Sequence, residues 1–554
     1  MSAIRKGIIM GKKNFDTIGL MIDMSRNSVM SMEGLKRFIP LLNKMGYNML
    51  MLYTEDTYEV DGEPYFGYMR GKYTKAEMKE IDAFAKSYGI KIIPCIQTLA
   101  HLEAAVRWGK IPVDMGPVMM VDDPRTYELI DRMFKTLSEC FESRLIHIGM
   151  DEAFHLGRGK HLDKYGYEPS VDIIGRHLKK VKEIAKKYDY EVMIWSDMYF
   201  RSWADGKYNI RRTTLPKEVI ENYDPDVIPV YWSYTYYDND QFVDVPRTPE
   251  MLDNHLQLSK NTWYAGGIWT WRGFIPANKY SIETMTPSIK DCIDKGIRNM
   301  FLTIWGNNGG ECPKMSTLPS LLYLAEVARG NTDEASIKAK FKKIVGIDFD
   351  DFIKIDKPND IRGYSWRYGN EVNPSKYMLY SDYFNGFLDY TVTIGDGERY
   401  KEVADELREV AKKSRKYAIL FNAAAKLCDV LEVKYDLGAR TRRAYTEGDK
   451  NELRRLAENE YVLAEKRLKE YSRAAEKMWF YENKPCGFDV QDRMLGGIIY
   501  RTDACRRRLL DYVNGKIDSI PELEEKILPY PGATEGIPYM ANKTQLYTSA
   551  NRLD

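Results

Sequence analysis

One alternation repeats eight times between about residue 15 and residue 310, and it limits the possible folds more than any other feature. Each repeat has a short apolar run followed by a stretch with the period of an amphipathic helix. Strands are expected at 18–24, 49–53, 90–96, 145–148, 191–195, 227–232, 264–269 and 300–305. Helices are expected between them, including 32–45, 75–88, 124–141, 171–188 and 287–295, the last starting on its proline.

This alternation predicts an α/β fold in the form of a closed (β/α)8 TIM barrel. A doubly wound open sheet is the alternative. No GxGxxG motif or Walker loop follows the first strand, which argues against that alternative.

Beyond the barrel, apolar stripes of helical period predict a mainly α-helical C-terminal domain. Leu453, Leu456, Leu463 and Leu468 form one stripe, and a further helix is expected at 490–513. Three such helices with short polar loops would pack as a small antiparallel bundle. The expected division is a lead-in at 1–14, the barrel at 15–330, the helical domain at 331–519 and a tail at 520–554.

Composition and charge exclude several classes of partner. A net charge of +1 gives no reason to expect nucleic acid or an anionic membrane. No apolar run reaches the roughly eighteen residues of a membrane span, and the first residues lack the apolar core of a signal peptide. The seven cysteines are scattered without CxxC spacing, which favours reduced thiols and a cytoplasmic location.

Polar and aromatic residues follow every predicted strand. In a barrel these strand ends share one face, where active sites lie. The two adjacent acids Asp151 and Glu152, after the fourth strand, attract most attention. Neighbouring side chains of a continuing strand point to opposite faces, so a shared site requires the backbone to turn at Gly149 and Met150. The alternative is that one acid only caps a helix near His155.

Paired acids support acid–base chemistry, because like charges push the two pKa values apart. No HExxH or other metal-binding spacing occurs, and no GxSxG, so neither a metal or other cofactor nor a serine nucleophile is expected. Glycoside hydrolysis fits better, yet the segment 262–274 around the seventh strand has no acid to act as nucleophile. An adjacent pair of acids suggests instead that a 2-acetamido group of the substrate attacks the anomeric carbon.

Five segments carry a resemblance to a known family: HIGMDE at 147–152, DMSRN at 23–27, LYTED at 52–56, LAH at 99–101 and IWG at 304–306. They resemble the β-N-acetylhexosaminidases of glycoside hydrolase family 20, over about residues 15–310. The N-terminal α+β domain usual in that family is not expected here, because the first predicted barrel strand begins at about residue 18. The chain looks like the branch that carries a helical C-terminal domain instead.

The resemblance implies that Asp151 holds the acetamide nitrogen and that Glu152 is the general acid/base. His101 would sit in a relay with Glu55 or Asp56. Two positions depart from the family: Asn307 stands near the place of an acid, leaving gluco or galacto preference open, and Tyr234 or Tyr236 would replace a tyrosine after the seventh strand. The substrate-binding residues expected are Arg26, His101, Trp195, Trp232, Tyr234, Trp269, Trp305 and Asn307.

The sequence therefore predicts an exo-acting β-N-acetylhexosaminidase that removes terminal β-linked GlcNAc or GalNAc with retention, through an oxazoline intermediate. A hydrolase of unsubstituted β-hexosides and a catalytically silent glycan-binding barrel are the alternatives. The aromatic residues in the segment 479–488, between two helices, predict a homodimer interface. They could equally cover the barrel of their own chain.

Overall fold

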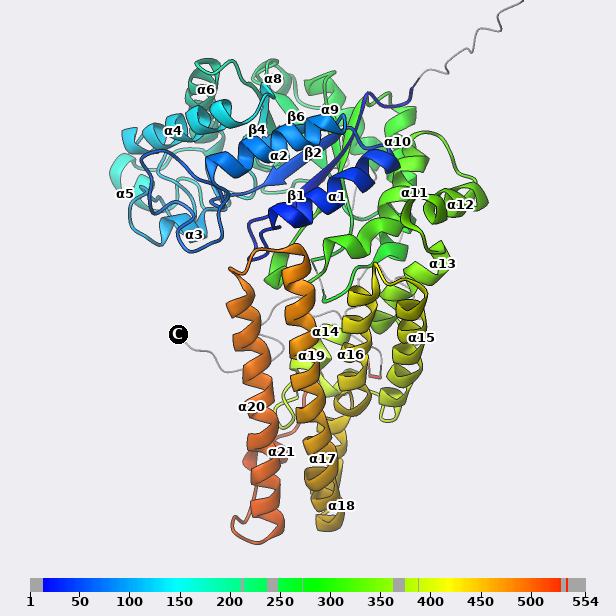
Figure 1. Cartoon of the computed structure of the whole chain (residues 1–554). Helices are drawn as coiled ribbons and strands as arrows, with labels where there is room; N and C mark the ends of the chain where they lie inside the picture. The colour runs from blue at the N-terminus through cyan, green and yellow to red at the C-terminus, as the bar shows by residue number, and fades with distance from the viewer. Residues whose placement is uncertain are drawn as a thin grey trace, which may run out of the picture.

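Eight parallel strands close into one barrel in this computed structural model, which describes residues 13–210, 214–236, 248–271, 273–361, 374–386, 388–529 and 535–536. β1 pairs with both β2 and β8, so no edge remains (Figure 1). The predicted barrel is confirmed, and the open sheet is excluded. The strands are β1 Thr17–Asp23, β2 Met49–Tyr53, β3 Lys91–Cys95, β4 Leu145–His147, β5 Glu191–Trp195, β6 Ile228–Trp232, β7 Trp263–Gly267 and β8 Asn299–Ile304.

The helices around the barrel are set by caps and apolar faces that the sequence displays. Ser31 caps α1 (Met32–Met45) by accepting from the Gly34 amide at 3.0 Å, and Thr74 and Glu77 form a capping box on α2 (Lys75–Ser87). α4 (Pro124–Cys140) and α6 (Ser170–Lys186) also lie where they were expected, within two residues.

The prediction for the helix before β8 was wrong at its start. α10 runs over Asn278–Asp294 and carries Pro287 inside it. An internal proline removes one backbone hydrogen bond. Here the buried face continues on both sides of the proline, through Tyr280 and Met285 before it and Ile289 after it, which keeps the helix together across the missing bond.

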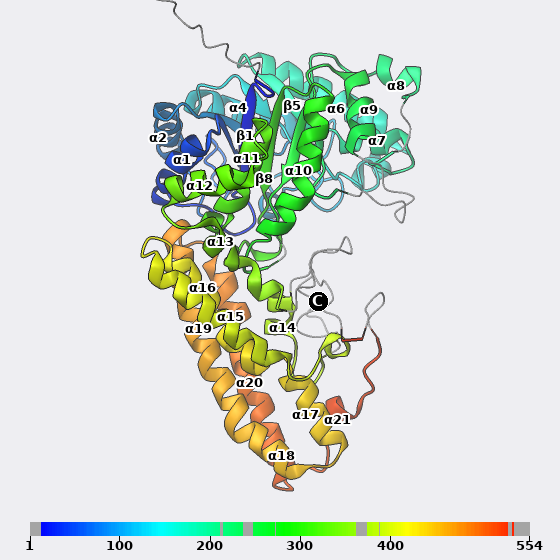
Figure 2. The ribbon, with the colours of Figure 1, turned by 90° about the vertical axis from the view of Figure 1, so that its right-hand side faces the viewer.

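The helical region after the barrel is larger than the expected three helices (Figure 2). α11 (Leu318–Ala328) packs against α10 and α1 of the barrel, α12 (Glu334–Val345) packs against α11 and α1, and α14 (Pro374–Tyr380) follows. The elongated bundle then comprises α15 Arg399–Lys413, α16 Ala418–Lys434, α17 Leu437–Thr446, α18 Lys450–Arg455, α19 Tyr461–Glu482 and α20 Phe488–Val513. The short α21 (Pro521–Glu524) belongs to the predicted tail, most of which lies outside the described residues, as does the lead-in before residue 13.

Two features of this bundle escaped prediction for physical reasons. α16 is apolar on nearly all sides because it is the central helix, so it shows no single stripe. Between α18 and α19 one π-helical turn, Leu456–Glu460, inserts an extra residue and shifts the phase of the buried face. Leu453, Leu456 and Leu468 are buried as expected, but Leu463 is rotated outward to 37% exposure.

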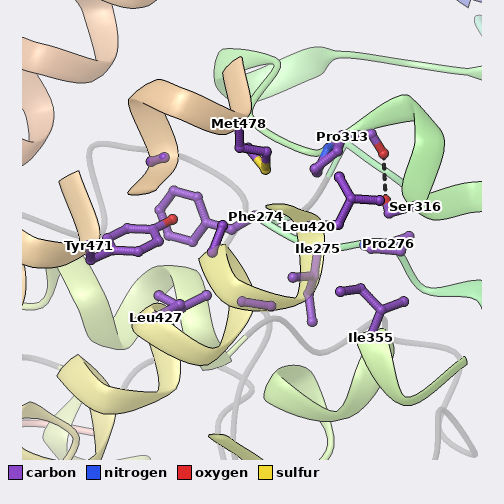
Figure 3. A pocket seen from close by; sticks show the side chains of 13 residues that line it. Phe274, Ile275, Pro276, Pro313, Ser316, Ile355, Leu420, Leu427, Tyr471 and Met478 are labelled. Carbon is purple, nitrogen blue, oxygen red and sulfur yellow. Dashed lines mark hydrogen bonds between the residues drawn. The ribbon is translucent and has the colours of Figure 1, made fainter. Parts of the chain in front are cut away.

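The bundle joins the barrel through an apolar contact (Figure 3). Phe274 and Ile275, from the segment after β7, face Leu420 and Leu427 of α16 and Tyr471 of α19. The space left between them is about 20 Å³, close to the room needed for one water molecule. Within the described part of the chain, no helix is long and apolar enough to cross a membrane.

Candidate active site

The backbone leaves strand geometry immediately after β4. Gly149, Met150 and Glu152 have φ of 74°, 72° and 51°, in the left-handed region. Both acids consequently reach one imidazole: His101 Nε2 lies 3.3 Å from Asp151 Oδ2 and 3.5 Å from Glu152 Oε2. The next helix, α5 (Lys160–Tyr165), starts after Gly159, so neither acid caps a helix near His155.

Asp151 is fixed by a residue that the sequence did not single out. Gln97, two residues beyond β3, donates from Nε2 to Asp151 Oδ1 at 2.6 Å and to the Tyr53 hydroxyl at 2.9 Å. Its Oε1 accepts from the Met150 amide at 3.1 Å. Gly149 is required beside it, because a Cβ there would lie 2.1 Å from Gln97 Oε1. In the sequence, the only feature that could have pointed to Gln97 is its position as an amide residue directly after a predicted strand.

The charges of Asp151 and His101 support each other. Burial tends to raise the pKa of Asp151, but His101 and the Gln97 hydrogen bond hold it below the ordinary range. Burial tends to lower the pKa of His101, and the charge of Asp151 overrides this and raises it to about 9. The pair is therefore an imidazolium facing a carboxylate near neutral pH.

Glu152 has the opposite tendency. Burial and the charge of Asp151 both raise its pKa, partly offset by His101 and Arg201. Its amide donates to Asp197 Oδ2 at 3.1 Å. Asp197 opens α7 (Asp197–Trp203), and Arg201 Nε donates to the same oxygen at 3.3 Å. A charged acid next to one that keeps its proton can share general acid–base work.

Arg26 sits in the loop after β1 and pairs with Glu55. Its Nη2 and Nε lie 3.0 and 3.2 Å from Glu55 Oε1, which also accepts from the Tyr53 hydroxyl at 3.0 Å. Burial raises the pKa of Glu55 to about 7 despite Arg26.

The expected relay from His101 through Glu55 or Asp56 differs from the structure. Glu55 is taken by Arg26, and Asp56 pairs with Arg70 at 3.1 Å. The His101 ion pairs among the described residues run directly to the two catalytic candidates instead.

Aromatic side chains gather beside the acids. Trp305 packs on Tyr53 with ring centroids 4.8 Å apart, and Trp232 stacks on Tyr234 at 5.2 Å. Trp269 lies two residues beyond β7, stacks on Trp271 at 4.1 Å, and its Nε1 donates to the Tyr234 carbonyl at 2.7 Å. These groups form one continuous wall after β6, β7 and β8.

The structure shows where Trp195 lies and which of the two candidate tyrosines is nearer to the acids. Trp195 is buried in the barrel interior against His147, with ring centroids 4.4 Å apart, so it lines the core beneath the wall. Of the two tyrosines, Tyr234 lies in the field of Asp151 and Glu152, whereas Tyr236 hydrogen-bonds Asp291 of α10.

The loop after β8 holds Asn307 in a short 3₁₀ turn, Asn307–Gly309. The next acid, Glu311, pairs with the buried Lys376 of α14 at 2.8 Å. Lys376 also donates to the Asn308 carbonyl at 2.7 Å, so the helical region tethers this loop. In the part of the chain that the structure describes, no group of three or more His, Cys, Asp or Glu side chains could hold a metal ion.

Comparison with known proteins agrees with this geometry. The family described as glycosyl hydrolase family 20, catalytic domain, matches residues 15–221, and the glycoside hydrolase 20C C-terminal domain matches residues 350–540. Hexosaminidase D of Homo sapiens is 23% identical over 217 residues, which cover 36% of this chain and 41% of that protein. A beta-hexosaminidase of Akkermansia muciniphila is 26% identical over 179 residues, covering 26% and 36%. The chain thus matches less than half the length of these relatives.

Among solved structures, a GH20 exo beta-N-acetylglucosaminidase from Vibrio harveyi is similar with a TM-score of 0.44 and 16% identity, over 62% of this chain and 58% of that one. The chain has a closed (β/α)8 barrel with paired acids after β4, and it matches the catalytic and C-terminal domain families named above. These features together define its class as a glycoside hydrolase. The chain belongs to glycoside hydrolase family 20, with the C-terminal domain of its 20C group.

Proposed function

We propose that the protein is an exo-acting β-N-acetylhexosaminidase that removes terminal β-linked GlcNAc or GalNAc by substrate-assisted hydrolysis. The observation that carries this proposal is the pairing of a charged Asp151 with a Glu152 of raised pKa on one turn. The segment around β7 offers no acid as a nucleophile. The substrate then has to supply the attacking group itself.

In the proposed mechanism the acetamide oxygen attacks the anomeric carbon while Glu152 protonates the departing oxygen. Asp151 accepts the acetamide N–H and stabilises the positive charge that develops on the oxazoline. His101 and Gln97 keep Asp151 ionised and oriented. Glu152 then takes a proton from the incoming water, which opens the oxazoline with overall retention of configuration.

Arg26 is proposed to bind ring hydroxyls, with its orientation set by Glu55. The wall of Trp232, Tyr234 and Trp305 would hold the sugar face and the acetamide methyl. Tyr234 is the proposed partner of the acetamide oxygen.

A β-N-acetylhexosaminidase and a hydrolase of unsubstituted β-hexosides differ in the substituent that their substrates carry at carbon 2. We expect turnover of a chromogenic 2-acetamido-β-glucoside and none of its 2-hydroxyl counterpart, compared at equal enzyme concentration. Turnover of both would favour a hydrolase of unsubstituted β-hexosides, and turnover of neither a silent glycan-binding barrel.

Asp151→Asn tests the mechanism itself. A neutral amide cannot stabilise the oxazoline charge, so kcat on the 2-acetamido substrate should fall by about 10³-fold, on the order of 4 kcal/mol. An exposed residue, Asp163, provides the matched control as Asp163→Asn. A trapped covalent sugar–enzyme adduct would overturn the mechanism, as would failure of a thiazoline to inhibit.

Two further assignments are proposals of the same kind. The seven cysteines are free and six are buried, which supports a reducing, cytoplasmic location. A homodimer is also proposed, but not all the aromatic residues of the segment 479–488 can form its interface. Trp479 and Phe488 are buried within their own chain, whereas Phe480 is 47% exposed. The domain limits 15–330 and 331–519 are retained as the working division.

A further inference from the structure

The turn between α19 and α20 reaches into the loop that carries Arg26. It lies directly beneath β1 and α1 (Figure 1). Met30 and Asn483 form an antiparallel bridge, the Lys484 amide donates to the Val29 carbonyl at 2.7 Å, and the Ser31 amide donates to the Glu482 carbonyl at 2.8 Å. We call residues 482–491 the hairpin turn.

A buried polar cluster ties the hairpin turn to two active-site loops at once. The Glu482 carboxylate, 1% exposed, accepts from the amides of Lys314 and Met315 at 2.7 and 2.8 Å. The Lys314 ammonium donates to Ser28 Oγ at 2.6 Å and to Asn483 Oδ1 at 3.5 Å. Since every one of these groups is buried, moving the hairpin turn would leave charged groups without partners.

The loop after β8 completes the enclosure of Arg26. Gln491 Nε2 donates to the Gly309 carbonyl at 3.2 Å. A Cβ on Gly310 would lie 2.6 Å from the Arg26 carbonyl, and a Cβ on Gly487 would lie 2.3 Å from the Asn27 carbonyl. The backbone at Arg26 and at the next residue, Asn27, is therefore in close contact with the loop after β8 and with the hairpin turn.

We propose that the hairpin turn is a positioning element of the active site: it fixes the loop of residues 26–30 and so holds the Arg26 guanidinium where the sugar binds. This gives the C-terminal helices a role in substrate binding. The inference rests on the proposed function only in assigning Arg26 to the substrate. Displacement of a binding group by about 1 Å can cost about a hundredfold in rate, so a small shift of this loop is measurable.

Gly487→Ala tests the proposal, and Gly515→Ala is its matched control. Both glycines have positive φ, 96° and 71°, at opposite ends of α20, so alanine strains both backbones. Only the Gly487 methyl meets another group, because nothing lies within 4 Å of a Cβ on Gly515. On the 2-acetamido substrate we expect Gly487→Ala to raise KM about tenfold with kcat nearly unchanged. Gly515→Ala should stay within about twofold of the wild type.

A merely structural role predicts a different pattern, namely a lower kcat from a smaller folded fraction at unchanged KM. A double-mutant cycle separates the two. In an Arg26→Lys background, Gly487→Ala should have little further effect on KM, since the group being positioned is already altered. Equal effects of Gly487→Ala in both backgrounds would overturn the proposal.

Hydrogen exchange gives a readout that is independent of the activity. The amides of residues 27–31 should exchange faster in Gly487→Ala than in Gly515→Ala, and wild-type rates in both variants would overturn the proposal. Absence of turnover by the wild type would count against the proposed function alone. If Gly487→Ala does not fold, Gln491→Ala replaces it, with the same expected directions for KM and for exchange.

Discussion

Gln97 donates a 2.6 Å hydrogen bond to Asp151, and this bond helps to keep the pKa of Asp151 below its ordinary value. Removing it in Gln97→Leu should raise that pKa. The proposed mechanism requires an ionised Asp151, so activity should be lost as pH falls through its pKa. The acidic limb of the pH–rate profile should therefore move to higher pH in the variant. A hydrogen bond to a charged group contributes about 1.5–3 kcal/mol, so kcat should also fall at least tenfold.

Thr98→Val is the matched control for this measurement. Thr98 is equally buried and adjacent, and its hydroxyl donates to the Ile148 carbonyl at 2.9 Å without touching Asp151. An acidic limb that moves equally in both variants would show that Gln97 acts only through packing.

In the proposed mechanism, Glu152 sets the basic limb of the pH–rate profile. Burial and the charge of Asp151 raise its pKa, and activity falls as pH rises through that pKa because the general acid loses its proton. Glu152→Gln should therefore flatten the basic limb. It should also spare substrates whose leaving groups depart without protonation. Equal losses on activated and unactivated leaving groups would contradict the general-acid role.

At the scale of single residues, the two acids, Arg26 and most of the aromatic side chains predicted from the sequence lie near one another in the structure, and their roles in catalysis are proposals. It could not identify Gln97, because the importance of an amide depends on which carboxylate it meets across the barrel. The sequence could not show that His101 contacts the two acids directly and that Glu55 influences it only through its charge. Glu55 and Asp56 are adjacent in sequence, but each is neutralised by its own arginine.

Among the elements, the turn after β4 has the strictest steric requirement. Gly149→Ala would place a methyl 2.1 Å from Gln97 Oε1 at a φ of 74°. Gly296→Ala has nearly the same φ, 73°, with nothing within 4 Å. Both should lose about 1–2 kcal/mol of stability from the left-handed backbone. Only Gly149→Ala should lower kcat, by about a hundredfold, measured beside denaturant unfolding. Wild-type kcat in that variant would remove the turn from the mechanism.

The strands were predictable to within two residues because each is short, buried and bounded by polar residues. The helices were predictable where one face meets solvent. The predicted range of α10 was too short because Pro287 was interpreted as the start of the helix. α16 has no polar face, so its sequence does not show a helical period. The π-helical turn before α19 is invisible to any fixed period.

For the whole molecule, the proposed homodimer now depends on aromatic residues that remain exposed on the hairpin of α19 and α20. Phe480 is 47% exposed and Tyr500 is 70% exposed. Sedimentation at micromolar concentration should give a species of two chains, and Phe480→Asp with Tyr500→Asp should return it to the chain mass of 64.4 kDa. A wild-type protein that sediments only at the chain mass would remove the dimer.

The bonds between the loop after β1 and the hairpin turn also constrain how the protein is made. Ser31 and Glu482 are 451 residues apart in the chain, yet they are hydrogen-bonded. Ribosomes add about 5–20 residues per second, so the barrel strands are synthesised tens of seconds before the hairpin turn. We expect the nascent barrel to acquire its hydrophobic core early and its substrate affinity last. Enzyme activity would then appear only when synthesis is complete. A chain that ends before the hairpin turn would be compact but would bind its substrate poorly.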